Sequence, residues 1–160
     1  MAPGKPASES RVEVTHLVMP GDANVLGSAF GGRIMEWADV AAGMAAMRHA
    51  RLPVATASID QLTFLAPVRI GQIAILHAQV TAAFTTSVEV GVEVLTEDPG
   101  TGERRKCCDA FLTFVALDRD GRPTTVPPLL ASTEEERRHA RDARVRREAR
   151  LALRAALRRQ

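Results

Sequence analysis

The segment from Arg33 to His49 most constrains how this chain can fold, because apolar side chains cover almost its whole circumference when it is drawn as a helix. An amphipathic surface helix carries its apolar residues on one stripe, so this pattern instead predicts a helix buried by the rest of the protein. Gly43, a poor helix former, predicts that another element packs closely against it. Leu52-Pro53 ends the helical run. A single helix cannot bury its own surface, and the remaining residues must therefore enclose it.

The rest of the chain has the pattern of an antiparallel sheet. From Val88 to Val94, valines alternate with Glu or Gly, which is the two-residue period of a half-buried strand. Five strands are expected, with turn-forming residues between them, at residues 11–18, 55–64, 72–84, 87–96 and 107–118. One strand, one buried helix and four further strands predict an α+β fold, in which a five-stranded antiparallel sheet wraps a long central helix. Because one helix covers only part of a sheet, two such domains are expected to pair.

Charge divides the chain into a domain and a tail. The net charge of the whole sequence is +2, but residues 133–160 hold ten arginines and five acidic residues, so the preceding part is net acidic. We expect a flexible N-terminus at residues 1–10, one domain at 11–131 and an Arg-rich helical tail at 132–160.

The start of the tail helix is predicted by Ser132-Thr133, two residues that cap helices, and by the three glutamates that follow them. The helix has an apolar stripe made of Val145, Ala149, Leu153, Ala156 and Leu157. We expect this stripe to dock on the domain or on a neighbouring subunit. The arginines are expected to stay in solvent or to attract an anionic substrate from a distance.

Composition argues against several classes of protein. No segment approaches the about 20 consecutive apolar residues of a membrane-spanning helix, and residues 1–10 lack the apolar core of a signal peptide, so a cytoplasmic location is expected. A disulfide between the adjacent Cys107 and Cys108 would be strained, and no His or Cys spacing matches a zinc site. We therefore expect two reduced cysteines and no metal.

Asp39 is the main candidate for a catalytic residue, since it places a carboxylate within the apolar helix. Burying an unpaired carboxylate costs on the order of several kcal/mol, so Asp39 either has a catalytic role or lies on the one wet face of the helix and caps a backbone group. Asn24 lies in a turn, where an asparagine ordinarily bonds its own backbone. Gly31-Gly32 precede the helix, and free N–H groups at a helix N-terminus suit a developing oxyanion.

Several separated motifs keep one order and spacing from about Val12 to Leu129. They are Met19-Pro-Gly-Asp-Ala-Asn-Val-Leu-Gly27, Phe30-Gly-Gly-Arg-Ile-Met-Glu-Trp-Ala-Asp39, Ala46-Met-Arg-His49, Thr56-Ala-Ser-Ile-Asp60, Phe64-Leu-Ala-Pro-Val-Arg-Ile-Gly71, Ser87-Val-Glu-Val90 and Ala110-Phe-Leu-Thr-Phe-Val-Ala-Leu-Asp118. Together they resemble the signature of hot-dog acyl-CoA hydrolases. The resemblance implies a hot-dog fold and the hydrolysis of acyl-CoA to free fatty acid and coenzyme A.

The resemblance also implies an active site and an assembly. Asn24 and Asp39 match the family's active-site pair, which comes from opposite subunits of a dimer, and such dimers often form hexamers. Asp39 is expected to act as general base on water, or to attack the carbonyl directly and give an anhydride; the sequence leaves both open. Asn24 would position the water or the thioester carbonyl, the Gly32 N–H would bind the oxyanion, and Gly31 would contact the substrate. No cofactor or metal is expected beyond the coenzyme A of the substrate.

Further residues are candidates for contacts with coenzyme A. Thr56 and Ser58 lie in a segment that resembles the family's pantetheine-contacting strand, and Ser87 is expected to face the same region. The candidates for binding the phosphates are Arg69, Arg104 and Arg105, each of which is otherwise an ordinary solvated residue. None of the four histidines is assigned to catalysis.

Two other functions compete with hydrolysis. A hot-dog domain could bind acyl-CoA without cleaving it, but the presence of both Asn24 and Asp39 disfavours this. The basic tail could bind nucleic acid, but five acidic residues lie among its ten arginines and no aromatic residue is available for base stacking. The sequence therefore favours a homo-oligomeric acyl-CoA thioesterase that binds no nucleic acid.

Overall fold

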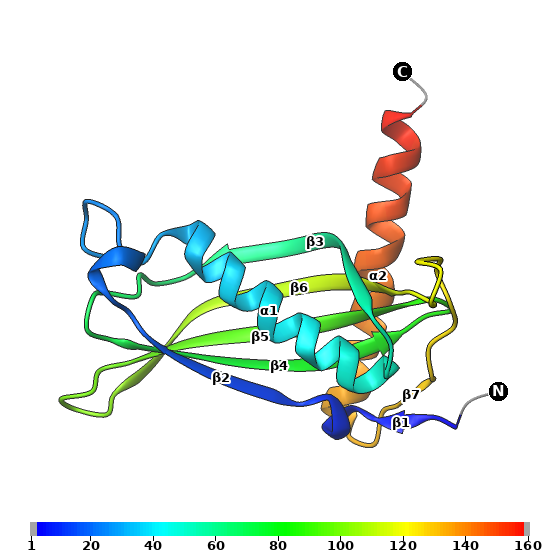
Figure 1. The fold of residues 1–160 in the computed structure, drawn as a ribbon, viewed down its shortest axis with the longest axis horizontal. Helices are drawn as coiled ribbons and strands as arrows, with labels where there is room; N and C mark the ends of the chain where they lie inside the picture. The colour runs from blue at the N-terminus through cyan, green and yellow to red at the C-terminus, as the bar shows by residue number, and fades with distance from the viewer. Residues whose placement is uncertain (1–2, 159–160) are drawn as a thin grey trace.

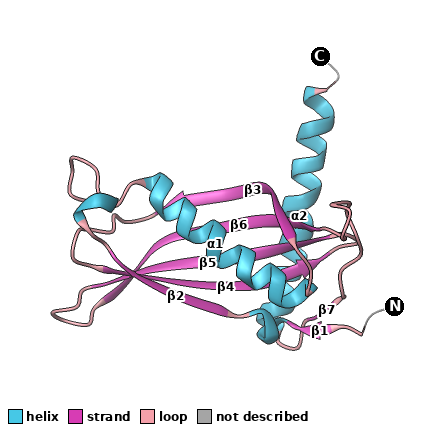
Figure 2. Ribbon diagram, in the orientation of Figure 1, coloured by secondary structure: helices cyan, strands magenta, loops and turns pink. Residues whose placement is uncertain are grey.

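A five-stranded antiparallel sheet wrapped on one helix forms the centre of the computed structural model, which describes residues 3–158 (Figure 1). The strands lie in the order β2-β4-β5-β6-β3. They span Val12–Leu17 (β2), Val54–Phe64 (β3), Ile73–Ala83 (β4), Ser87–Glu97 (β5) and Arg104–Ala116 (β6). Helix α1 spans Gly31–Ala50 and lies along one face of the sheet (Figure 2). The expected α+β fold and its five antiparallel strands are confirmed.

Small side chains let α1 approach the sheet closely. Six alanines of the helix are buried, namely Ala38, Ala41, Ala42, Ala45, Ala46 and Ala50. They share one core with the four buried valines of β5, Val88, Val90, Val92 and Val94. Gly43 extends this contact as expected, because a Cβ built there would lie 3.6 Å from the Phe114 ring.

The opposite side of α1 is open, so the prediction of a helix buried all round is wrong for the single chain. Met35, Val40 and Met47 are exposed, Val40 by 57% of its surface. The sheet covers one side of the helix only, and the second apolar side is left without a cover. An apolar helix face of this kind is typical of a surface that another chain covers.

The N-terminal segment packs on the domain, in contrast to the flexible start expected for residues 1–10. Strand β1 (Lys5–Pro6) pairs in parallel with β7 (Leu129–Leu130), and a 3-10 turn, η1, spans Ala7–Ser10. Ser10 is buried, and its hydroxyl accepts a hydrogen bond from the Val80 N–H at 2.9 Å. Residues 1–2 lie outside the described range.

The Arg-rich tail is one helix, α2, from Glu134 to Leu157. Thr133 caps its start as predicted, since its hydroxyl accepts from the Glu136 N–H at 3.1 Å and the Glu136 carboxylate accepts from the Thr133 N–H. The helix starts behind the sheet, on the side away from α1, and its C-terminal half extends past the sheet (Figure 1). Within residues 3–158, no helix is long and apolar enough to cross a membrane.

Arginines, rather than the expected apolar stripe, attach α2 to the sheet. The three largest members of that stripe are exposed: Val145, Leu153 and Leu157. Arg146 instead binds the carboxylate of Glu89, which is only 1% exposed, through two hydrogen bonds of 2.7 and 3.0 Å. Its guanidinium also lies 3.6 Å from the centre of the Phe111 ring. The stripe does not dock on its own domain, and the expectation that the arginines stay in solvent is wrong for Arg146; docking of the stripe on a neighbouring subunit stays a prediction.

Two further arginines continue the same contact face. Arg147 lies over the ring of Phe84 at 4.8 Å, and Arg150 binds the Asp60 carboxylate of β3. Between them and the sheet, Ala143 is fully buried and lets the helix backbone come close. The partner carboxylates lie on strands far away in sequence, so no local pattern within the tail could indicate these pairs.

His49, at the end of α1, is a buried histidine with one unsatisfied nitrogen. It is 0% exposed, its Nε2 lies 2.8 Å from the carbonyl oxygen of Pro127, and its Nδ1 has no partner among the described residues. Burial is the largest influence on its pKa and lowers it from the ordinary 6.5, and nearby Lys5 lowers it further; the hydrogen bond to Pro127 and the charge of Glu9 act in the opposite direction. The folded protein therefore favours the neutral imidazole.

We expect the stability of the protein to depend on pH through His49. The stabilisation from neutral His49 is complete above the unfolded pKa of 6.5 and is lost as the pH falls through the lowered pKa of the folded state. His49→Gln keeps a donor for Pro127 but does not titrate. Between about pH 7.5 and 5.5, the Tm of the wild type should fall by about 2–4 °C more than that of the variant. Parallel Tm curves in scanning calorimetry would contradict this expectation.

We also expect α2 to depend on its buried ion pair. Arg146→Ala leaves the Glu89 carboxylate without its cation beneath the helix, and removing one partner of a buried pair costs about 3 kcal/mol of unfolding free energy. The matched control is Arg144→Ala, an exposed arginine of the same helix, which should change stability by less than about 0.5 kcal/mol. Urea denaturation measures both; similar losses in the two variants would show that the pair is not the source of the stability.

Candidate functional site

Asp39 lies on the open side of α1, where the helix faces strand β3. It is half-buried, and its Oδ1 accepts a hydrogen bond from the hydroxyl of Thr56 at 2.8 Å. Its Oδ2 accepts no hydrogen bond from residues 3–158. The carboxylate thus lies on the open face of the helix, with a threonine hydroxyl rather than a backbone group as its partner, and this position is compatible with a catalytic role. The site therefore offers one oriented carboxylate with a free oxygen.

Asn24 lies in the loop between the 3-10 turn η2 (Pro20–Asp22) and α1. Its Oδ1 accepts from the N–H of Leu26 at 2.9 Å and from the N–H of Ser28 at 3.4 Å, the expected bonding of an asparagine to its own turn. Its amide nitrogen donates to no atom of the described chain. No contact joins Asn24 to Asp39 within residues 3–158, so a single chain does not bring this predicted pair together.

The tip of the same loop is unusually apolar. Val25 is 102% exposed and Leu26 78% exposed, directly beside Asn24. Gly27, at φ +74°, closes the turn in a conformation that side-chain-bearing residues rarely adopt. The turn thus presents two apolar side chains and one amide group away from the domain.

Gly31 and Gly32 form the first turn of α1, and no side chain caps this end. The first hydrogen bonds of the helix run from the N–H groups of Arg33 and Ile34 to the carbonyl of Phe30, which leaves the glycine N–H groups free for a ligand. A Cβ at Gly32 would meet nothing within 4 Å, whereas a Cβ at Gly31 would lie 3.3 Å from the Phe64 ring.

A cavity of about 380 Å³ opens beside these glycines. Its lining is largely apolar and includes Gly31, Ile34, Phe64 and Leu65. Phe64 and Leu65 were not among the predicted site residues, because an apolar residue at the end of a strand has no feature that separates a cavity wall from ordinary core. The lack of room for a side chain at Gly31 becomes visible only in the folded structure, where the Phe64 ring lies close to it.

The predicted coenzyme A contacts on β3 and β5 divide between the two faces of the sheet. Thr56 faces α1, whereas Ser58 bonds Asp60 at 3.0 Å, and Asp60 in turn binds α2. The register shifts between Thr56 and Ser58, and this bulge reverses the facing of the second residue. Ser87 shares the α2 face with Glu89, two residues further along β5. The structure therefore brings only Thr56 to Asp39.

The three predicted phosphate-binding arginines differ in their partners. Arg104 is paired with Glu97 at 2.5 Å and Arg105 with Glu103 at 2.9 Å. Arg69 forms no ion pair with the described residues, and it lines a pocket of about 300 Å³ together with Arg105. Arg69 is thus the member of this set with a free guanidinium.

The histidines and cysteines lie outside this constellation. His16 stacks on Trp37 with ring centres 4.4 Å apart, and burial lowers its pKa against the opposing charge of Asp22. Burial raises the pKa of the Cys107 thiol to about 11 and that of Cys108 above its usual value, so both are free thiols in the core. Among residues 3–158, no three His, Cys, Asp or Glu side chains are grouped so that they could hold a metal ion.

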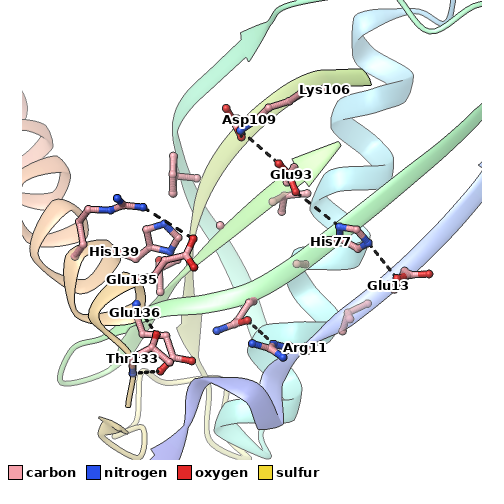
Figure 3. Close-up of a pocket in the computed structure, with 18 residues that line it drawn as sticks. Arg11, Glu13, His77, Glu93, Lys106, Asp109, Thr133, Glu135, Glu136 and His139 are labelled. Carbon is pink, nitrogen blue, oxygen red and sulfur yellow. Dashed lines mark hydrogen bonds and ion pairs between the residues drawn. The ribbon is translucent and has the colours of Figure 1, made fainter. Parts of the chain in front are cut away.

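A cavity of about 800 Å³ lies on the opposite face of the sheet, under the start of α2 (Figure 3). Its charged side chains neutralise one another along a row: Glu13 lies 3.0 Å from His77, and Lys106 lies 2.8 Å from Asp109 and 3.5 Å from Glu93. Neither Asn24 nor Asp39 lines it. The candidate site is therefore the open face of α1 and not this cavity under α2.

Comparison with known proteins places this site in a family. A model of the thioesterase superfamily matches residues 26–103. YkhA, an uncharacterized acyl-CoA thioester hydrolase of Bacillus subtilis, is 43% identical over 128 residues, which are 80% of this chain and 74% of that protein. The chain belongs to the acyl-CoA thioester hydrolase family. Acetyl-coenzyme A thioesterase of Mus musculus is 36% identical over 94% of this chain, and the match spans 26% of that longer protein.

Solved structures agree over almost the whole chain. A hexameric acyl-CoA thioesterase superposes with a TM-score of 0.92 at 41% identity and covers 98% of this chain and 99% of that one. The acyl-CoA hydrolase of Staphylococcus aureus, solved in complex with butyryl coenzyme A and coenzyme A, gives a TM-score of 0.91 at 36% identity and covers 98% and 96%. The predicted family, hot-dog fold and hydrolase class are confirmed. A match over 98% of the chain also extends into α2, past Leu129, where the sequence resemblance ends.

Proposed function

We propose that this protein hydrolyses acyl-CoA thioesters to a free fatty acid and coenzyme A at a site built on Asp39, Asn24 and Thr56. The observation that carries the proposal is the Asp39 carboxylate, held by Thr56 at 2.8 Å on the open face of α1. In this chain 15 positions separate Asn24 from Asp39, and 17 separate Asp39 from Thr56. Three solved variants of the Staphylococcus aureus hydrolase replace by alanine an asparagine, an aspartate and a threonine with these same two intervals.

Asp39 supplies the base in this mechanism. Its free Oδ2 accepts a proton from water as the water oxygen adds to the thioester carbon. The carbon–sulfur bond then breaks, the proton passes to the leaving sulfur, and the products are a fatty acid and the coenzyme A thiol. In the alternative, an Asp39 oxygen attacks the carbon and gives a mixed anhydride that water opens. Label found in the Asp39 carboxylate after a single turnover in ¹⁸O-labelled water would establish the anhydride path, with water opening the anhydride at the Asp39 carbon, because direct hydrolysis places the label in the fatty acid alone.

Asn24 and the glycines supply the hydrogen-bond donors. The Asn24 oxygen is already engaged by the N–H groups of Leu26 and Ser28, so only its amide NH₂ is available to a ligand. A donor suits the thioester carbonyl oxygen, which becomes an oxyanion when water adds. The free N–H of Gly32 is the second donor, and Gly31 beside it borders the cavity that would receive the substrate.

The remaining contacts concern coenzyme A and the acyl chain. Arg69, with its free guanidinium, is the preferred partner for a phosphate, and Arg105 borders the same pocket. The apolar cavity beside Gly31 suits an acyl chain. Contacts of Ser58, Ser87 and Arg104 with coenzyme A stay predictions. The reaction as proposed draws on no cofactor or metal besides the coenzyme A of the substrate, and the cytoplasmic location also stays a prediction.

The proposed assembly is a homodimer that shares its sites, with a hexamer as the larger form. Three features support it: the apolar open side of α1, the apolar loop tip beside Asn24, and the long edge strand β3, which has only β6 as a neighbour. The hexameric relative supports the larger assembly. Pairing of two chains would bring Asn24 of one to Asp39 of the other.

We expect Asp39→Asn to fold and to lower turnover by at least about 10²-fold, in line with the loss of a general base. Glu36→Gln, an exposed carboxylate one turn earlier on α1, is the matched control and should stay within about twofold of the wild type. Thiol release from a series of acyl-CoA chain lengths measures both. Near-wild-type turnover by folded Asp39→Asn would remove Asp39 from the mechanism, and wild-type protein that binds acyl-CoA without releasing thiol would support the non-catalytic alternative.

We expect activity to return when two inactive variants exchange subunits. A heterodimer of Asn24→Ala and Asp39→Asn chains has one site with both native residues and one site with neither, so random mixing should restore up to about a quarter of the sites. Exchange is verified by native mass spectrometry of differently tagged chains. Fully exchanged but inactive mixtures would show that each site is built within one chain.

A further inference from the structure

Strand β3 carries Thr56 on an edge that is weakly held by the sheet. Its pairing with β6 shifts register twice, between Thr56 and Ser58 and again between Ile59 and Gln61. Residues in a bulge lack their ladder partner, and within residues 3–158 no strand pairs with the outer side of β3, the edge that a second chain would cover in the proposed dimer. Two interruptions within six residues break the continuous pairing of β3 with β6 on the C-terminal side of Thr56.

Side chains supply the missing attachment at the second bulge. Asp60, which the register skips there, has a side chain that is only 7% exposed and accepts from the Ser58 hydroxyl at 3.0 Å. Arg150 of α2 binds the other oxygen of the same carboxylate and donates to the Thr113 hydroxyl of β6 at 3.1 Å. Arg150 therefore bridges the edge strand to its neighbour at the point where their backbones part.

We propose that Arg150 is a positioning residue for the candidate active site: through Asp60 it fixes the bulged part of β3, and β3 in turn holds the Thr56 hydroxyl against Asp39. Arg150 lies on the sheet face away from α1 and touches neither Asp39 nor Thr56. It acts through the strand alone. The tail helix, attached behind the sheet, thus contributes to the chemistry in front of it.

A second arginine of the same helix provides the comparison. Arg146 makes an ion pair that is even more deeply buried, but its partner Glu89 lies on β5, in the middle of the sheet, where strands on both sides fix the backbone. Removing either arginine weakens the attachment of α2. Only the removal of Arg150 releases the strand that carries Thr56.

The test rests on the proposed function and measures kcat and KM for acyl-CoA hydrolysis by the full chain. Arg150→Ala should lower kcat by about tenfold while KM stays within about twofold, since Arg150 orients the base and contacts no substrate. Arg146→Ala should leave kcat within about twofold, although it also destabilises α2. Arg150→Lys, which keeps a cation near Asp60, should recover most of the lost kcat. All variants are assayed at a temperature where circular dichroism shows them folded.

A double-mutant cycle separates positioning from a general loss of structure. If Arg150 acts through Thr56, then Arg150→Ala should lower kcat no further in a Thr56→Val background. An undiminished tenfold loss in that background, or equal losses of kcat in Arg150→Ala and Arg146→Ala, would overturn the proposal.

Hydrogen exchange tests the strand without relying on catalysis. Backbone amides of residues 56–61 should exchange at least about tenfold faster in Arg150→Ala than in the wild type, and at an unchanged rate in Arg146→Ala. If the wild-type protein releases no thiol, the proposed function is refuted. Hydrogen exchange alone then tests whether Arg150 positions β3. Unchanged exchange in Arg150→Ala would refute the inference even in an active enzyme.

Discussion

The close contact between the alanine side of α1 and the valines of β5 determines where chemistry can lie in this fold. Ala38, Ala41 and Ala42 are buried because their methyl groups let the helix backbone settle on the sheet. A carboxylate at any of these positions would be buried without a partner and would cost on the order of several kcal/mol. Asp39 follows Ala38 by one residue, which turns it toward the rim of the contact, where Thr56 meets it. The packing thus selects the one side of the helix on which a carboxylate is tolerated.

The edge strand β3 carries Thr56, the hydrogen-bond partner of the Asp39 carboxylate. This position on an edge explains why a second helix, α2, is attached to the sheet. β3 borders the open side of α1, so its outer edge has to stay accessible if another chain is to complete the site. An accessible edge lacks half of the backbone hydrogen bonds that hold a central strand. Asp60 and Arg150 attach the strand from behind, on the face that the site does not need. The Arg-rich tail, which composition alone marks as an appendage, is in this respect part of the domain.

The sequence predicts the layers of the fold well and the facing of individual residues less well. Period-two valines and an apolar helix suffice for a sheet wrapped on a helix, because these patterns follow from which surfaces must be buried. The resemblance to the family's pantetheine-contacting strand implied contacts for both Thr56 and Ser58, but the bulge between them turns Ser58 to the other face of the sheet. Nothing in the sequence signals a bulge of this kind. The docking of α2 was missed for another reason. Arginines are normally solvated, and the carboxylates that bind Arg146 and Arg150 lie on strands far away in the sequence.

The loop that carries Asn24 shows how one interface can complete two sites. Its turn is closed by its own side-chain oxygen and by Gly27, so the position of the Asn24 amide group is fixed before any partner arrives. The same turn holds Val25 and Leu26 in solvent, which is unfavourable for a single chain. In the proposed twofold pair, the loop of each chain would enter the site of the other, because an isologous interface uses the same surface twice. Burial of Val25 and Leu26 would then favour association of the two chains. The rigid turn would hold the Asn24 amide, a hydrogen-bond donor, opposite Asp39 of the partner chain.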